Sequence, residues 1–431
     1  MNTDILLTGA TFEASGNPMT SHWQDVVRIN TDGALLIRDG RIVALGDAPV
    51  LKRSYPQAKV TDYSGKLICP GFVDAHAHYP QTAMIASWGK QLIDWLNSYT
   101  FPEEMRFGDP SFAKETAESY LDLVCAHGTT TVCSYTTIHP CSTDAFFAAA
   151  QSRRMAVVAG KTCMDRNAPD GLCDTALSAY DDSKALLERW HGRDRLRYAI
   201  TPRFSPTSTP EQLSALGALW AEYPDCLMQT HLSEQLPEIR WVADLFPDAR
   251  DYLDTYEAHG LLGARAVFGH AIHLTGRERD RIAETGAALV HCPTSNTFIG
   301  SGLMDVAGLA ARSISLGLAT DTGGGSSFSM LRTMAAAYEI AQLRGTALHA
   351  SQLLWLATAG SAASLHLGHE IGLLQPGLVA DLTILDLSST PAIAQRSARA
   401  NDIWEAVFPT IMMGDDRAVA DVWIAGQPVR T

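Results

Sequence analysis

Short apolar runs recur through the middle of the chain, between about residues 70 and 372, and most are separated by segments with helical patterning. We count eight such runs, at residues 68–78, 128–137, 155–165, 196–204, 226–234, 266–274, 287–296 and 314–325. Two of the segments between them, 110–128 and 209–224, open on a proline or a Thr-Pro pair, which favours a helix start. Eight strand-then-helix units predict an α/β fold of the (β/α)₈ barrel type. A doubly wound open sheet is the alternative, but no GxGxxG follows the first run to support it.

The two ends of the chain share a different pattern, which is typical of β-structure. Short alternating runs broken by Gly and Asp-Gly turns occupy residues 4–13, 33–46 and 58–71, and the same style returns at 377–387 and 418–429. Because chain ends often lie close together, we expect them to build one small β-sandwich domain jointly. The predicted domain bounds are 1–69 for its N-terminal part, 70–372 for the barrel and 373–431 for its C-terminal part.

The composition supports a large core and limits the partners. Apolar residues make up 46% of the 431 residues and charged residues 19%. The formal net charge is −14, which argues against nucleic acid or an anionic membrane as the main partner. We identify no signal peptide at residues 1–16 and no apolar run of about 18 residues, so we expect a cytoplasmic protein. The eight cysteines form no CxxC pair, and we expect reduced thiols.

Metal-binding residue types gather at the C-terminal ends of the predicted strands, which form the active-site face of a (β/α)₈ barrel. His76 and His78 are two residues apart, so on a strand both side chains point to one face. His231 closes the fifth run and Asp321 closes the eighth. Zinc prefers nitrogen and oxygen ligands of this kind, and a catalytic site keeps one position for water. We therefore predict one metal ion, Zn²⁺ with Fe²⁺ as the alternative, held by His76, His78, His231 and Asp321.

Further residues near these strand ends are candidates for proton transfer. His270 and His273 are three residues apart and face opposite sides of a strand, and we assign only His270 to the site. Glu234 could reach a metal-bound water, although a capping or solvated carboxylate is the alternative. We interpret His291 as structural or as a supporting residue.

A second metal ion and a phosphate site are both disfavoured by the sequence. Barrels of this type with two metal ions commonly use a lysine at the end of the fourth strand, where this chain has Arg203. Lys161 in the third run keeps that alternative open. The three glycines after Asp321 resemble a phosphate loop, but the lysine of the P-loop pattern is absent.

The motifs "PGFVDAHAH", "THLSE", "GHAIHL", "HCPTSN" and "ATDTGGG" in this order resemble the amidohydrolase superfamily, and specifically its purine and pyrimidine deaminase branch. The stretches "WLNSYTFPEE", "MDRNAPDG" and "TPRF" are similar to those of the guanine-specific members, and the resemblance covers nearly the whole chain. It implies hydrolysis of guanine to xanthine and ammonia in purine catabolism, with the metal ligands given above and a homodimeric assembly. It also places His270 at the metal-bound water. The alternatives are an aminohydrolase of another ring, such as a pterin, triazine or cytosine, and a non-catalytic scaffold.

The resemblance also assigns residues to the substrate. The expected catalytic residues are Glu234 as the proton carrier, with His270 and Asp321 at the water. The expected substrate-binding residues either match the family's purine-recognition positions or form the sides of the pocket. They are Gln81, Leu92, Trp95, Arg203, Phe204, His231 and Glu234.

Overall fold

The computed structural model describes residues 4–88 and 91–429, which fold as two compact units. One unit comprises the residues up to 74, 122–131 and those from 329 onward. The other comprises residues 75–121 and 132–328. The domain bounds predicted from the strand pattern stay a prediction.

A parallel sheet of strands forms a nearly closed barrel, in the order β14-β13-β12-β11-β10-β8-β7-β6. The backbone N–H of Asp321 donates to the carbonyl of His76 at 2.9 Å, and that of His78 donates to Thr322 at 2.6 Å, so the first strand meets the residues that follow the last. The short strand β9 (Thr162–Cys163) pairs with β10. All eight predicted runs contain a barrel strand: β6 (Phe72–His78), β7 (Thr129–Tyr135), β8 (Ala156–Gly160), β10 (Leu196–Pro202), β11 (Leu227–Leu232), β12 (Ala266–His270), β13 (Ala288–His291) and β14 (Ser315–Leu318).

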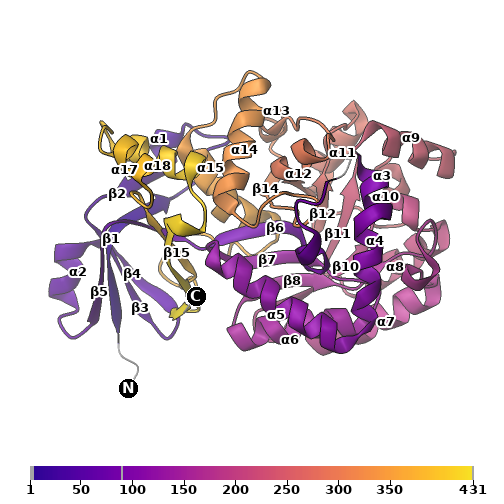
Figure 1. Cartoon of the computed structure of the whole chain (residues 1–431), viewed down its shortest axis with the longest axis horizontal. Coiled ribbons are helices and arrows are strands. Elements are labelled where there is room, and N and C mark those ends of the chain that lie inside the picture. Colours follow the sequence, from indigo (N-terminus) through magenta and orange to yellow (C-terminus); the bar gives the residue numbers. More distant parts are fainter. Residues whose placement is uncertain (1–3, 89–90, 430–431) are drawn as a thin grey trace. The chain divides into compact units, whose positions relative to one another are not determined.

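Helices alternate with these strands along the chain, and Figure 1 shows α6, α7 and α8 on the outside of the strands. Their first turns explain where several begin, because Thr175, Thr209 and Thr275 each accept a hydrogen bond from the backbone three residues later. The (β/α)₈ prediction is confirmed. The helices are α5 (Pro110–Ala126), α6 (Pro140–Arg153), α7 (Ala176–Trp190), α8 (Pro210–Glu222), α9 (Leu236–Leu245), α10 (Asp254–Glu257), α11 (Gly276–Thr285), α12 (Pro293–Phe298), α13 (Val306–Ala310) and α14 (Met330–Leu343).

The connection between β6 and α5 is long and irregular, and it supplies one wall of the pocket described below. We call residues 79–88 and 91–108 the wall segment. Its helical pieces are η1 (Tyr79–Met84), α3 (Leu92–Trp95), the π-helical turn η2 (Leu96–Thr100), α4 (Phe101–Met105) and η3 (Arg106–Gly108). Leu92, Leu96 and Phe101 from this segment pack in one apolar cluster with Phe204 and Ile299.

Both ends of the chain contribute strands to a single sheet, as the sequence predicted. Its order is β17-β16-β15-β5-β1-β3-β4, with β2 paired to β1, and Figure 1 shows several of these strands side by side. Leu7, Ile68 and Trp423 belong to its buried core. The strands are β1 (Ile5–Ala14), β2 (Val27–Asn30), β3 (Gly33–Arg38), β4 (Arg41–Asp47), β5 (Lys59–Pro70), β15 (Leu382–Asp386), β16 (Val419–Ile424) and β17 (Gln427–Val429).

Short helices complete the same unit: α1 (Trp23–Val26), α2 (Ala48–Ser54), α15 (Ala350–Trp355), α16 (Ser361–Ser364), α17 (Pro391–Ser397) and α18 (Ile403–Met413). Among the described residues, no helix has the length and apolar character that crossing a membrane requires. All eight cysteines are free thiols. The cytoplasmic location and the homodimer stay predictions.

Candidate active site

A pocket lies within the barrel unit, at the C-terminal ends of its strands. Every predicted substrate-binding residue lines this pocket. The lining residues are His78, Gln81, Leu92, Trp95, Leu96, Arg203, Phe204, His231, Glu234, His270, Ile299, Asp321 and Gly324.

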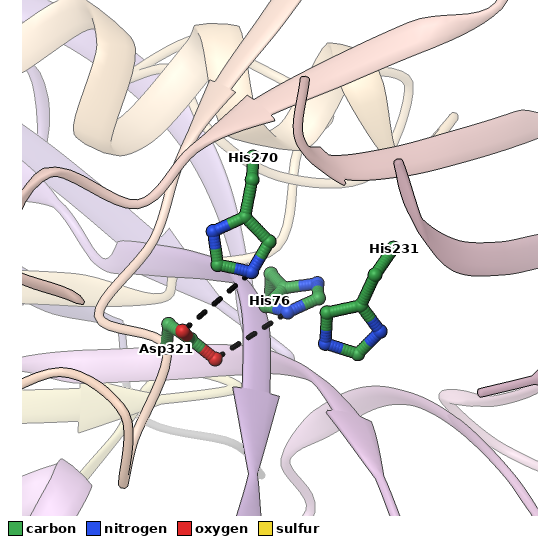
Figure 2. Close-up of side chains that lie close together, drawn as sticks. All are labelled: His76, His231, His270 and Asp321. Atoms are coloured by element: carbon green, nitrogen blue, oxygen red, sulfur yellow. Dashed lines mark ion pairs between the residues drawn. The ribbon is translucent and has the colours of Figure 1, made fainter. Parts of the chain in front are cut away.

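Four buried side chains at one end of the pocket can hold a metal ion together. His76, His231, His270 and Asp321 each offer a ligand atom, and these atoms all lie within 4.8 Å of one another. Figure 2 shows the three imidazoles gathered around the Asp321 carboxylate, with His76 Nε2 3.4 Å from Oδ1 and His270 Nε2 3.7 Å from Oδ2. We call this group, together with His78, the metal end of the pocket.

His78 lies beside this group. Its Nε2 is 3.2 Å from Nε2 of His231 and 3.4 Å from Oδ1 of Asp321. The alternation of β6 thus brings His76 and His78 to one place, as their spacing predicted. The four-residue group contains His270, whereas the predicted ligand set contains His78.

In both His231 and His270, Nδ1 is hydrogen-bonded to an oxygen atom, which leaves Nε2 available to a metal ion. His231 Nδ1 donates to the Arg203 carbonyl at 2.7 Å, and His270 Nδ1 lies 2.9 Å from Asn296 Oδ1. Since these oxygens only accept, Nδ1 carries the proton and Nε2 keeps its lone pair when the ring is neutral. Among the described residues, buried Nε2 of His270 has no hydrogen-bond partner. Histidines that bind metals are oriented in this way.

The protonation states also fit a metal ion. Burial lowers the pKa of His76 and holds the pKa of His78 and His231 well below the usual range. Burial alone would raise the pKa of Asp321, but the hydrogen bond from His76 and the nearby histidines lower it to about 2. Neutral imidazoles and an ionised carboxylate are the forms that bind a metal ion.

The backbone is strained where these side chains leave the strands. His270 and Asp321 adopt φ angles of 65° and 50°, in the left-handed region that non-glycine residues seldom occupy. A Cβ atom on Gly269 would lie 2.5 Å from Cε1 of His76, so only glycine there leaves room for that imidazole.

Glu234 lies next to the metal end, and its two oxygens have different surroundings. Oε1 accepts a hydrogen bond from Ser301 Oγ at 2.8 Å, whereas Oε2 is 3.5 Å from Nε2 of His270. Burial raises the pKa of Glu234, against the opposing effect of a His270 charge. Burial opposes protonation of His270, but the Glu234 and Asp321 charges outweigh it and raise its pKa. Glu234 and His270 are therefore suited to share and pass on a proton.

Gln81 and Arg203 of the pocket lining form a buried polar network with Glu104, which we call the recognition end. Gln81 Nε2 donates to Glu104 Oε1 at 2.9 Å, and Gln81 Oε1 accepts from the Gly323 backbone at 3.2 Å. Arg203 Nη1 donates to both Glu104 oxygens, at 3.0 and 2.7 Å. Phe204, Leu92 and Trp95 supply apolar walls nearby.

The other candidates from the sequence have separate partners. Lys161 is buried against Asp174 and does not line the pocket. His273 Nε2 contacts the Ser301 carbonyl at 2.8 Å. His291 is buried, and burial together with a His270 charge lowers its pKa to about 3.

Sequence reasoning missed three residues that hold this site: Glu104, Ser301 and Asn296. Glu104 lies inside the quoted stretch "WLNSYTFPEE", Ser301 follows "NTFIG", and Asn296 ends "HCPTSN". The motifs indicated these stretches, but only the contacts show which of their side chains form hydrogen bonds to the site residues.

Comparisons with known proteins agree with this architecture. The amidohydrolase family model matches residues 67–429. Guanine deaminase of Escherichia coli K12 is 44% identical over 404 residues, which is 94% of this chain and 92% of that protein. The solved E. coli guanine deaminase superposes with a TM-score of 0.96 at 41% identity, covering 99% of both chains.

A second solved structure bears on the ligand. Guanine deaminase from C. acetobutylicum, with bound guanine in its active site, superposes with a TM-score of 0.90 at 27% identity. It covers 99% of this chain and 100% of that one. The chain belongs to the amidohydrolase family, whose superfamily is metal-dependent, and within it to the guanine deaminases.

Proposed function

We propose that this protein hydrolyses guanine to xanthine and ammonia. The observation that carries the proposal is a single pocket lined by His78, His231, His270 and Asp321 of the metal end, by the buried Glu234 and by the Arg203–Gln81 pair. The relatives named guanine deaminase support the same substrate.

We further propose one Zn²⁺ per subunit at the metal end, held by His76, His78, His231 and Asp321 with His270 beside it. The mixed nitrogen and oxygen donors, the neutral imidazoles and the ionised carboxylate support this assignment. When bound, such an ion lowers the pKa of a water molecule so that hydroxide is available near neutral pH.

The protein's own residues then direct the water and its protons. Asp321 and His270 orient the water toward C2 of guanine, the carbon that carries the amino group. Glu234 Oε2 takes one proton from the water and passes it to the adjacent ring nitrogen as the water oxygen bonds to C2. It then carries the second proton, from the new C2 hydroxyl, to the amino group. The bond between C2 and the amino nitrogen breaks, ammonia leaves, and the C2 carbonyl of xanthine forms.

Recognition of the purine uses the recognition end of the pocket. Arg203 uses only Nη1 toward Glu104, so the rest of its guanidinium can donate to acceptors on the ring edge. Gln81 adds an amide to the same edge, while Phe204, Leu92 and Trp95 pack against the faces of the ring.

Ammonia release from a panel of aminated rings tests the proposal, with bound metal quantified in the same preparation. The panel contains guanine, adenine, cytosine, a pterin and an aminated triazine. We expect turnover of guanine far above the others, in a protein with about one metal ion per chain. Turnover of another ring without turnover of guanine overturns the assignment. A protein that cannot be loaded with metal and releases no ammonia favours a scaffold.

A further inference from the structure

Glu104 is a buried carboxylate behind the recognition end of the pocket. It lies in α4 with 0% of its surface exposed, and it does not belong to the pocket lining. Its side chain accepts hydrogen bonds from Gln81 and Arg203, and both of these residues line the pocket. Glu104 therefore acts on a bound ligand through these two residues.

The contacts of Gln81 leave its amide a single orientation. A carboxylate can only accept a hydrogen bond and a backbone N–H can only donate one. Nε2 of Gln81 must therefore face Glu104, and Oε1 must face the Gly323 backbone. Without Glu104, only the Gly323 N–H would hold the Gln81 amide in this orientation, and Nε2 would lose its carboxylate acceptor.

The contacts of Arg203 fix its charge as well as its direction. Its guanidinium is 3% exposed, and Nη1 meets both oxygens of Glu104 within 3.0 Å. A buried cation without a counter-ion is costly and attracts anions strongly. The Glu104 carboxylate offsets that charge, so this end of the pocket offers directed hydrogen bonds with little net charge.

We infer that Glu104 is a positioning and specificity-determining residue: it orients Gln81 and neutralises Arg203, and the pocket thereby prefers a neutral purine over an anionic one. This inference rests on the proposed function, because it assigns the substrate class of that same pocket.

The test compares Glu104→Gln, which removes the charge, with Glu104→Asp, which keeps the charge but shortens the side chain. Kinetics with guanine give KM and kcat, and competitive inhibition at one pH gives Ki for hypoxanthine, a neutral ring, and for urate, an anionic ring. Glu103→Gln is the matched control, since Glu103 is the adjacent residue and pairs with the exposed Arg106.

For Glu104→Gln we expect KM to rise about tenfold, the scale of one hydrogen bond to a charged group. We expect kcat to stay within about threefold, as for a lost ground-state contact. The ratio of Ki values should move about tenfold in favour of urate. Glu104→Asp should raise KM without moving that ratio, and Glu103→Gln should change neither.

Two results overturn the inference. One is an unchanged KM and Ki ratio in Glu104→Gln, and the other is an equal weakening of both inhibitors, which a purely structural role would produce. Should Glu104→Gln fail to fold, Glu104→Asp decides alone: a higher KM at constant kcat supports the inference, and unchanged constants reject it. A wild-type protein that does not turn over guanine rejects the proposed function instead.

Discussion

The two ends of the pocket are built in different ways. At the metal end, His76, His231 and His270 lie on barrel strands and Asp321 follows one, so the backbone ladder places them. At the recognition end, Gln81 and Glu104 come from the wall segment, and they are held by side-chain hydrogen bonds. Under the proposed function, the barrel thus positions the hydrolytic residues, whereas a small side-chain network selects the ring. Substitutions at the metal end should therefore lower metal content or kcat, whereas substitutions at the recognition end should mainly raise KM.

Asp321→Ala should give the largest effect. Loss of the carboxylate removes one ligand and leaves the imidazoles without their anionic partner, so we expect guanine turnover at background and a large loss of bound metal. Metal analysis and ammonia release measure both. His273→Gln is the control, since this histidine lies three residues past His270 and outside the cluster, and it should retain metal. Full metal content and turnover in Asp321→Ala would contradict the assignment.

Glu234→Gln separates proton transfer from metal binding at the same end. The amide keeps the size of the side chain but cannot carry the proton, and we expect kcat to fall about 10²- to 10⁴-fold. Metal content and the melting temperature should match the wild type. A near-normal kcat would remove Glu234 from the mechanism.

Arg203→Met tests the recognition end. The loss of charged hydrogen bonds to the ring should raise KM about 10- to 100-fold, with a smaller change in kcat. Metal content should be retained, because the backbone carbonyl that holds His231 Nδ1 is still present. A loss of metal would show that the two ends are not separable.

Ser301→Ala should give the smallest effect. Ser301 Oγ donates to Oε1 of Glu234 at 2.8 Å, and removing one such hydrogen bond should lower kcat about five- to tenfold. KM and metal content should not change, since the hydrogen bonds of the Ser301 side chain go to Glu234 and Gln235 and not to Arg203, Gln81 or the cluster. Steady-state kinetics decide this, and an unchanged kcat means that Glu234 is held without Ser301.

The same contrast explains what the sequence could predict. Strand alternation and strand ends placed His76, His78, His231 and Asp321, because the side-chain period of a strand is two and barrel strands end on one face. The same rule allowed only one of His270 and His273 to face the site, and nearness to the apolar run "AVF" favoured His270. Of the two, the cluster contains His270.

Glu104 was not predictable by those means. A glutamate in a short helical turn looks like a solvated surface residue, and its burial depends on Gln81 and Arg203, which are 23 and 99 residues away in sequence. Ser301 likewise hydrogen-bonds to Glu234, which lies 67 residues away in the sequence. Such pairs follow from packing between connections, and local periodicity carries no information about them.

Arg203 serves both ends of the pocket with different parts of one residue: its carbonyl binds His231, and its side chain reaches Glu104. Any amino acid at this position supplies the carbonyl. We therefore expect that the side chain at 203 and the wall segment can be substituted together. The residues of the metal end would keep their positions. We expect a barrel built in this way to acquire a new substrate through changes in the wall segment and in the side chains at 203 and 204.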